Sequence, residues 1–194
     1  MSNELLNESL CYLIGAIDFA NDQGKSWRSE IVNSCKKNGL KIKFLDPTNK
    51  ITGLQKEVDE EHENISNLRQ SQNWTKLSSF MKTIVREDHR SVDLSDFVIF
   101  YIDPSVHTCG SYFEFQSALT QKKPYFIICN GGKEKIPSWL YGICDHNFFF
   151  SSINEVVDAY VDFLTEEYGK SITIQKNELK EFASAKLERI YNNF

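Results

Sequence analysis

Short apolar runs separated by polar or amphipathic stretches recur along most of the chain. Four of these runs have the length of a strand and many branched or aromatic residues: 11–17, 41–47, 96–103 and 124–129. A weaker run occupies 146–152. Runs of this length, bounded by turn residues, are typical of strands buried on both faces. The pattern therefore predicts about five strands, with room for a helix between most of them.

Helical patterns fill several of the intervals. Residues 24–40 form one predicted helix, which Ser26 can cap at its start and Gly39 can end. Further helices are predicted at 110–123 and 153–169, the second with a clear amphipathic period. Because parallel strands need a long crossover connection, these helices predict strand–helix–strand units.

A helical insertion near 48–90 separates the second strand from the third. Two helices are expected there, at 54–70 and 73–90. The second carries an apolar stripe formed by Leu77, Phe80, Met81 and Ile84. The composition of residues 48–75 leaves open whether they form a lid, a contact surface or an unconstrained excursion. One more helix is expected near 175–192, either as a cap on the core or as an assembly element.

The alternation of strands and helices predicts the α/β class. We expect a flavodoxin- or Rossmann-like open parallel sheet with helices on both faces. The chain has 194 residues, which suits one domain spanning 1–194. Neither an internal repeat nor a low-complexity linker divides the sequence.

The composition is that of an ordinary globular protein, with 41% hydrophobic residues and a formal net charge of -5. Without a long basic tract, binding of a nucleic-acid polymer or a membrane surface is not expected. Apolar runs stay below the roughly 18 residues of a membrane span, and the N-terminal pattern is not that of a signal peptide. The five cysteines include no CxxC pair, so reduced thiols and a cytoplasmic location are expected.

The functional residues are expected beyond the carboxyl ends of the strands, where ligands bind in folds of this class. Gly15, Ala16 and Asp18 follow the first strand at such an end. The turn after the third strand contains Thr108, Gly110 and Ser111. A small hydroxyl-rich turn that opens a helix suits a phosphate or a sugar hydroxyl, and it equally suits an ordinary helix cap.

Glu114 lies in the first turn of that predicted helix, between Phe113 and Phe115. A carboxylate among aromatic side chains is costly to desolvate unless a neighbour stabilises it or its charge has a function. Such a glutamate can act as a nucleophile or a general base. It is also a common first-turn residue of ordinary helices. The residues by themselves leave both interpretations open.

Two other residues are candidates by type and place. Asp88 precedes the third strand and can act as an acid, and Tyr12 in the first strand needs a partner for a buried hydroxyl. A thiol nucleophile at Cys109 is not supported by any motif. His62 lies in an acidic, solvated stretch without a second cluster of ligands, so neither a metal nor another cofactor is expected.

Four segments in order resemble the nucleoside 2-deoxyribosyltransferase family. They are "YLIGAIDFANDQGKSWRSEI", "VREDHRSVDLSDFVIFYID", "CGSYFEFQSALTQKKPYFII" and "IPSWLYGICDHNFFFSS", and they span most of residues 11–155. The turn "GSYFE" is similar to the family's Gly-[Ser/Thr]-x-x-Glu motif. The resemblance implies an enzyme that cleaves the N-glycosidic bond of a nucleoside and transfers the sugar to another base.

The resemblance also implies roles for individual residues. Glu114 matches the family's nucleophile, Tyr12 the tyrosine that orients it, and Asp88 the aspartate that contacts the nucleobase. Phe19, Trp27 and Trp139 are candidates for stacking on the base, and each can equally be a core residue. The implied ligands are a nucleoside or nucleotide and a free nucleobase, and the family's shared sites imply a homo-oligomer, a dimer or larger.

Two positions depart from the family's pattern. Six residues before the glutamate the transferases carry an aspartate, where this chain has Thr108; related nucleotide N-hydrolases carry a serine there that holds a 5′-phosphate. The segment "PSWLYG" has no equivalent of the asparagine that the family donates to a neighbouring subunit. Two alternatives therefore accompany transfer: an N-glycosidase acting on 5′-monophosphates or NAD-like substrates, and a non-catalytic nucleotide-binding module.

Overall fold

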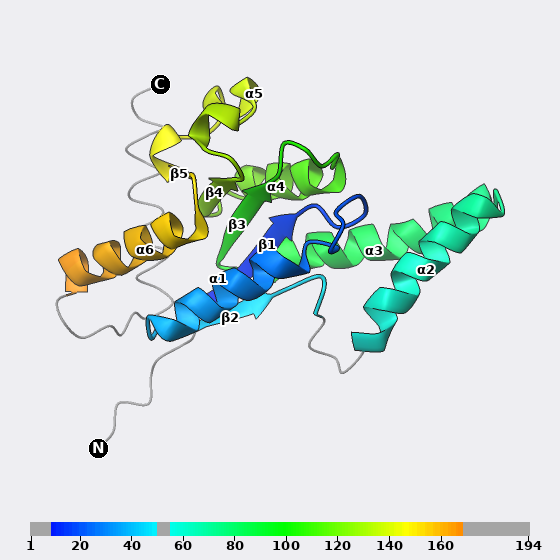
Figure 1. The fold of residues 1–194 in the computed structure, drawn as a ribbon, viewed down its shortest axis with the longest axis horizontal. Helices are drawn as coiled ribbons and strands as arrows, with labels where there is room; N and C mark the ends of the chain where they lie inside the picture. Colours follow the sequence, from blue (N-terminus) through cyan, green and yellow to red (C-terminus); the bar gives the residue numbers. More distant parts are fainter. Residues whose placement is uncertain (1–8, 50–54, 169–194) are drawn as a thin grey trace, which may run out of the picture.

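The computed structural model describes residues 9–49 and 55–168, whose strands form one five-stranded sheet (Figure 1). The strands are β1 (Ser9–Gly15), β2 (Ile42–Leu45), β3 (Phe97–Ile102), β4 (Tyr125–Cys129) and β5 (Phe149–Phe150). Their order is β2-β1-β3-β4-β5, and each neighbouring pair is parallel. The predicted α/β class with an open, flavodoxin-like parallel sheet is confirmed.

Helices cover both faces of the sheet, as the sequence predicts. On one face lie α1 (Lys25–Lys37) and α6 (Ile153–Tyr168), and on the other α3 (Trp74–Leu94) and α4 (Gly110–Thr120). Between β4 and β5 the chain forms η1 (Lys133–Lys135), α5 (Ser138–Tyr141) and η2 (His146–Phe148). The remaining helix, α2 (Gln55–Gln70), packs against α3.

The alternation of side chains along β1 decides which residues meet which helices. Leu13 belongs to the apolar cluster under α1 and α6, whereas Tyr12 and Ile14 belong to the cluster under α3 and α4. Tyr12 therefore points to the face of the sheet that carries Asp88 on α3 and Glu114 on α4.

The start of α1 differs from the prediction. The helix begins at Lys25, and Ser26 does not cap it. The carboxylate of Asp22 accepts hydrogen bonds from the backbone N–H groups of Gly24, at 2.9 Å, and Ser26, at 2.8 Å. It also accepts a hydrogen bond from the Ser26 hydroxyl. These bonds lower the pKa of Asp22, the Ser26 hydroxyl contributing most. Asp22 thus performs the capping that the sequence pattern assigned to Ser26.

Other bounds and placements also differ from the predicted ones. The fifth strand is limited to Phe149–Phe150, because the residues before it form η2. α3 continues to Leu94, beyond the predicted end at 90, and Asp88 lies within it, as in the predicted helix. Glu114 lies beyond the first turn of α4, which starts at Gly110. The helix expected near 175–192 falls outside the described residues.

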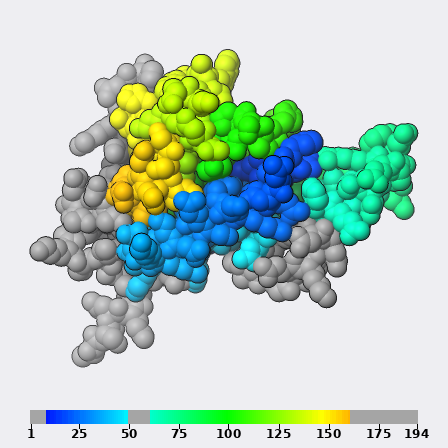
Figure 2. Space-filling model, in the orientation of Figure 1, coloured from blue at the N-terminus to red at the C-terminus, as the bar shows by residue number. Residues whose placement is uncertain are grey.

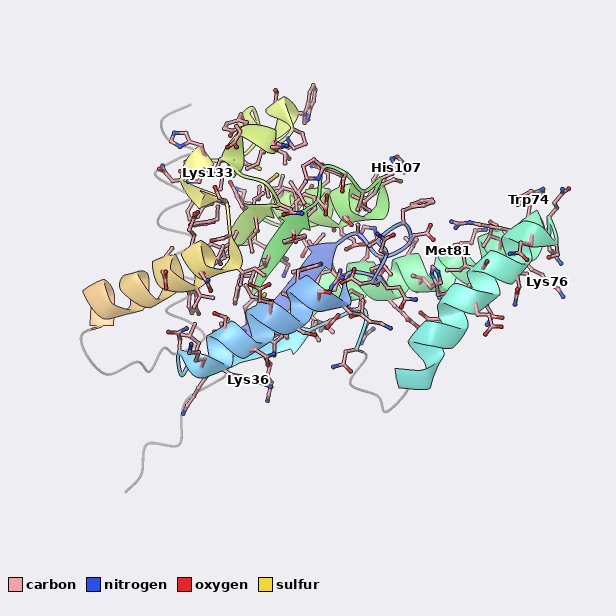
Figure 3. All side chains as sticks on the ribbon, in the orientation of Figure 1. Lys36, Trp74, Lys76, Met81, His107 and Lys133 are labelled. Carbon is pink, nitrogen blue, oxygen red and sulfur yellow. The ribbon has the colours of Figure 1, made fainter. Side chains whose placement is uncertain are left out.

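The insertion forms the predicted pair of helices. α2 and α3 make a hairpin that projects from the body of the molecule, with Trp74 near its tip (Figures 2 and 3). The guanidinium of Arg69 on α2 donates to both carboxylate oxygens of Asp18 in the loop after β1, at 3.0 and 2.6 Å. The hairpin therefore faces the loop that follows β1.

Gly24 adopts a φ of +70° where that loop turns into α1. A Cβ atom there would lie 2.3 Å from the Nη1 atom of Arg28 and 2.4 Å from the carbonyl oxygen of Ala16. Backbone atoms cannot rotate away from such a contact. We expect Gly24→Ala to lower the free energy of unfolding by about 3 kcal/mol, as measured by urea denaturation.

Gly39 provides a matched control, because it has the same φ of +70° but a Cβ atom there would meet nothing within 4 Å. Gly39→Ala should cost only the penalty of the left-handed conformation, about 1 kcal/mol. Equal losses in the two variants would show that the contacts with Arg28 and Ala16 do not matter.

Candidate active site

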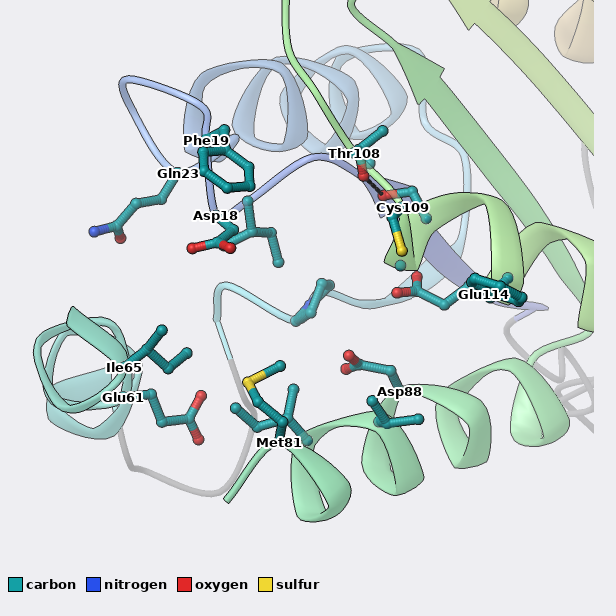
Figure 4. A pocket seen from close by; sticks show the side chains of 18 of the residues that line it. Asp18, Phe19, Gln23, Glu61, Ile65, Met81, Asp88, Thr108, Cys109 and Glu114 are labelled. Carbon is teal, nitrogen blue, oxygen red and sulfur yellow. Dashed lines mark hydrogen bonds between the residues drawn. The ribbon is translucent and has the colours of Figure 1, made fainter. Parts of the chain in front are cut away.

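A cavity of about 620 Å³ opens beyond the carboxyl ends of β1 and β3. These strands are neighbours although the chain forms β2 between them, so the loops that follow them diverge and leave a crevice. The loops after β1 and β3 form one side, and α2 and α3 form the other (Figure 4). In Figure 3, Met81 on α3 and His107 before α4 mark two sides of the opening.

Glu114 is half-buried at the wall of this cavity, and the Tyr12 hydroxyl donates a hydrogen bond of 3.1 Å to its Oε2 atom. Tyr12 is only 1% exposed, so this bond supplies the partner that its buried hydroxyl needs. The aromatic neighbours of Glu114 divide between two environments. Phe115 packs in the core, whereas Phe113 is 67% exposed and lines the cavity. The carboxylate is thus at a boundary between core and cavity.

The surroundings of Glu114 disfavour its charged form. Burial, followed by the negative charge of Asp88, raises the pKa of Glu114 to about 8. The hydrogen bond from Tyr12 and the positive charge of Arg28 act in the opposite direction. Burial also raises the pKa of Tyr12 well above its ordinary value, with the charge of Glu114 as the next cause. A carboxyl group with such a pKa at a cavity wall is a candidate catalytic group.

Asp88 approaches the cavity from the opposite wall. Its carboxyl group and that of Glu114 both point into the space between α3 and α4 (Figure 4). The two charges repel each other, as the effect of Asp88 on Glu114 shows. Two acidic groups that interact in this way tend to hold a single proton between them. The pair can therefore supply one nucleophile and one acid.

Thr108 and Ser111 meet beside Glu114, with 2.8 Å between their hydroxyl oxygens (Figure 4). Both line the cavity together with Gly110, where α4 begins. The exposed thiol of Cys109 lies at the same turn. Because a hydroxyl can donate and accept, this pair can bind a sugar hydroxyl or a phosphate oxygen.

The predicted residues Gly15 and Asp18 line the cavity, but three other predicted contacts lie elsewhere. Trp27 is in the core, where its ring stacks on Tyr101 with centroids 4.7 Å apart. Ala16 is buried outside the cavity lining, and Trp139 is 80% exposed on α5. The structure therefore does not bring Trp27, Ala16 or Trp139 to the cavity.

Other lining residues were missed by the sequence interpretation. Several of them are apolar and lie on α2 and α3: Ile65, Met81, Ile84 and Val85. The candidate Phe19 also lines the cavity. Met81, Ile84, Val85 and Asp88 follow the spacing i, i+3, i+4, i+7, which places them on one helix face. That spacing was the available signal, because it continues the apolar stripe of the insertion up to the carboxylate.

Two absences hold for residues 9–49 and 55–168. Within these residues we find no group of three or more histidine, cysteine, aspartate or glutamate side chains that could hold a metal ion. In the same part of the chain, each helix is too short or too polar to cross a bilayer.

No protein-family model matches the sequence, and no curated protein matches it. Among solved structures, the fold is similar to that of a 2-desoxiribosyltransferase from Leishmania mexicana, with a TM-score of 0.49 and 18% sequence identity. The similarity covers 82% of this chain and 99% of that chain. At this identity the similarity concerns the fold.

Proposed function

We propose that this protein is a nucleoside deoxyribosyltransferase-like enzyme, which cleaves an N-glycosidic bond with Glu114 as nucleophile. The main support is the placement of Glu114 at the cavity wall, hydrogen-bonded by Tyr12 and facing the second carboxyl group of Asp88. The four sequence segments that resemble this family contain the same three residues.

In the first step, a carboxylate oxygen of Glu114 attacks C1′ of the sugar, and the bond from C1′ to the base nitrogen breaks. Its electron pair goes to the base, which takes a proton from Asp88. The transition state carries positive charge on the sugar, which the adjacent carboxylate stabilises. Tyr12 holds the attacking oxygen in place through the 3.1 Å hydrogen bond.

In the second step, the Asp88 carboxylate removes a proton from an incoming base, whose nitrogen attacks C1′. The ester bond to Glu114 breaks, and the nucleophile is regenerated as a carboxylate. Two displacements at the same carbon retain its configuration. Water in place of the second base gives hydrolysis by the same chemistry.

The charges of the cavity favour an uncharged nucleoside as substrate. Its described lining contains Asp18, Glu61, Asp88 and Glu114, and neither a lysine nor an arginine. A 5′-phosphate would add negative charge to this surface, where the described basic side chains of the lining are His62, His89 and His107, and where Arg69 is already bound to Asp18. Apolar side chains from α2 and α3 offer a surface for the flat faces of a base.

One observation favours the second candidate, a nucleotide N-glycosidase. The hydroxyls of Thr108 and Ser111 lie at the start of α4, an eleven-residue helix whose first backbone N–H groups favour an anion. Thr108 replaces the aspartate that the transferases carry, which removes one source of repulsion toward phosphate.

An assay that separates these functions mixes the protein with a deoxynucleoside or its 5′-monophosphate, with and without a second free base. Products are followed by chromatography. We expect a new nucleoside only when the second base is present, with the monophosphate consumed at least about a hundredfold more slowly because of the acidic lining.

Release of free base from the monophosphate in the absence of an acceptor base would show that the protein is a hydrolase and not a transferase. Absence of product from either substrate would contradict the proposed reaction and leave the binding module as the remaining interpretation.

A further inference from the structure

Arg28 is the largest fully buried side chain of the described residues, with an exposure of 0%. It extends from α1 toward the end of β1. Its Nη1 atom donates to the carbonyl oxygen of Gly24 at 2.9 Å. Its Nη2 atom donates to the carbonyl oxygens of Gly15, at 2.9 Å, and Leu13, at 3.3 Å. One planar fork therefore joins the last residues of β1 to the far end of the loop that follows it.

That loop forms part of the cavity. Gly15 and Asp18 line it, and Gly24 closes the loop immediately before α1. Because Arg28 binds carbonyl groups at both ends of the loop, its guanidinium sets the distance between them. A lysine, with one point-like donor group, does not reproduce this fork.

An ion pair alone does not account for the burial of this charge. The Nε atom of Arg28 lies 3.5 Å from Oδ1 of Asp46, and it lacks a hydrogen-bond partner in the described part of the chain. The same Oδ1 atom accepts the backbone N–H and the hydroxyl of Thr48, at 2.8 and 2.7 Å. Burying a guanidinium with an incomplete ion pair is costly.

Four groups of opposite or potential negative charge act on Arg28. They are Asp46 after β2, Tyr12 on β1, Glu114 on α4 and Asp88 on α3. The last three form the proposed catalytic group, and the described residues of the cavity lining include neither a lysine nor an arginine. The guanidinium binds the carbonyl group of Leu13, the residue after Tyr12, and the Tyr12 hydroxyl donates to Glu114 at 3.1 Å. The charge of Arg28 therefore acts on the carboxyl pair from within the protein, where it is weakly screened.

We propose that Arg28 is a positioning residue of this site, which fixes the loop after β1 and supplies a buried positive charge to the carboxyl groups of Glu114 and Asp88. Its effect on turnover rests on the proposed function, whereas its effect on the ionisation of Glu114 can be measured without any substrate.

The test follows the carboxyl carbon of Glu114 by 13C NMR as a function of pH, with the resonance assigned through Glu114→Gln. Arg28→Gln removes the charge, and Arg28→Lys keeps it while losing the fork. We expect the midpoint of the Glu114 titration to rise by about one pH unit in Arg28→Gln and to stay within a few tenths of a unit in Arg28→Lys. Lys36→Gln, an exposed change on the same helix, should leave it unchanged.

Activity separates the two halves of the proposal. With the fork lost, Arg28→Lys should raise KM for the nucleoside about tenfold with a smaller change in kcat, because the loop wall is displaced. An unchanged KM would remove the positioning role. Inactive wild-type protein with the expected NMR shift would refute the proposed function and leave the charge effect standing.

A midpoint in Arg28→Gln equal to that of the wild type would overturn the electrostatic role. If Arg28→Gln does not fold, Asp46→Asn provides the test. This change releases Arg28 from its ion pair and should lower the midpoint of the Glu114 titration. An unchanged midpoint in Asp46→Asn would then overturn the same role.

Discussion

Glu114→Gln should reduce kcat for base exchange at least about a thousandfold, with little change in KM. The amide keeps the size of the side chain and can still accept the hydrogen bond from Tyr12. It cannot form the ester to C1′, and it carries no negative charge to stabilise the transition state. The measurement is steady-state transfer of a deoxyribosyl group, followed by chromatography.

Glu30→Gln is the matched control, because Glu30 is exposed on α1 and outside the cavity lining. It should retain wild-type kcat. Thermal denaturation should show that Glu114→Gln is folded, since the substitution removes a carboxyl group that burial disfavours. Activity within tenfold of the wild type would exclude Glu114 as the nucleophile.

The pH dependence of kcat/KM should reveal that Glu114 and Asp88 act as a pair. The proposed reaction needs one proton on the pair, with Glu114 ionised and Asp88 protonated. The pKa of Glu114 is raised to about 8, so the last proton leaves the pair near that pH. We therefore expect kcat/KM to fall about tenfold per pH unit above that value, because the proton donor is lost.

Asp88→Asn should lower kcat/KM at pH 7 about a hundredfold and abolish the fall at alkaline pH. The variant lacks the proton donor, and Glu114 loses the neighbouring charge that raises its pKa. Asp93→Asn, an exposed change one turn further along α3, should keep the wild-type profile. An alkaline fall that persists in Asp88→Asn would assign that ionisation to another group.

Hydrophobic patterning was sufficient for the fold because each strand is an apolar run with polar turns at both ends. The runs around Leu13 and Ile99 predict buried parallel strands, and both lie in the core of the sheet. The two-residue β5 was harder to place, since the aromatic run 148–150 divides between a 3-10 turn and a strand. Pattern alone does not distinguish those conformations.

The candidate site was predictable where a residue lies near the carboxyl end of a strand or near the start of a helix. Gly15, Asp18, Thr108 and Glu114 fall into this group, since the ends of parallel strands share one edge of a sheet. Of the three aromatic candidates for stacking, Phe19 lines the cavity and the two tryptophans do not. Trp27 is apolar enough to stack in the core on Tyr101, and Trp139 is exposed on a short helix away from the cavity.

Hydrophobic patterning predicts the number and parallel arrangement of the main strands, and it places Tyr12 on a strand and Asp88 and Glu114 on helices. The family resemblance implies that Tyr12 orients Glu114, but the 3.1 Å hydrogen bond between them and the buried charge of Arg28 come from the tertiary structure. Periodicity encodes which face of an element is buried. It does not encode which polar groups meet once elements distant in sequence pack together, and those contacts set the pKa of the candidate nucleophile.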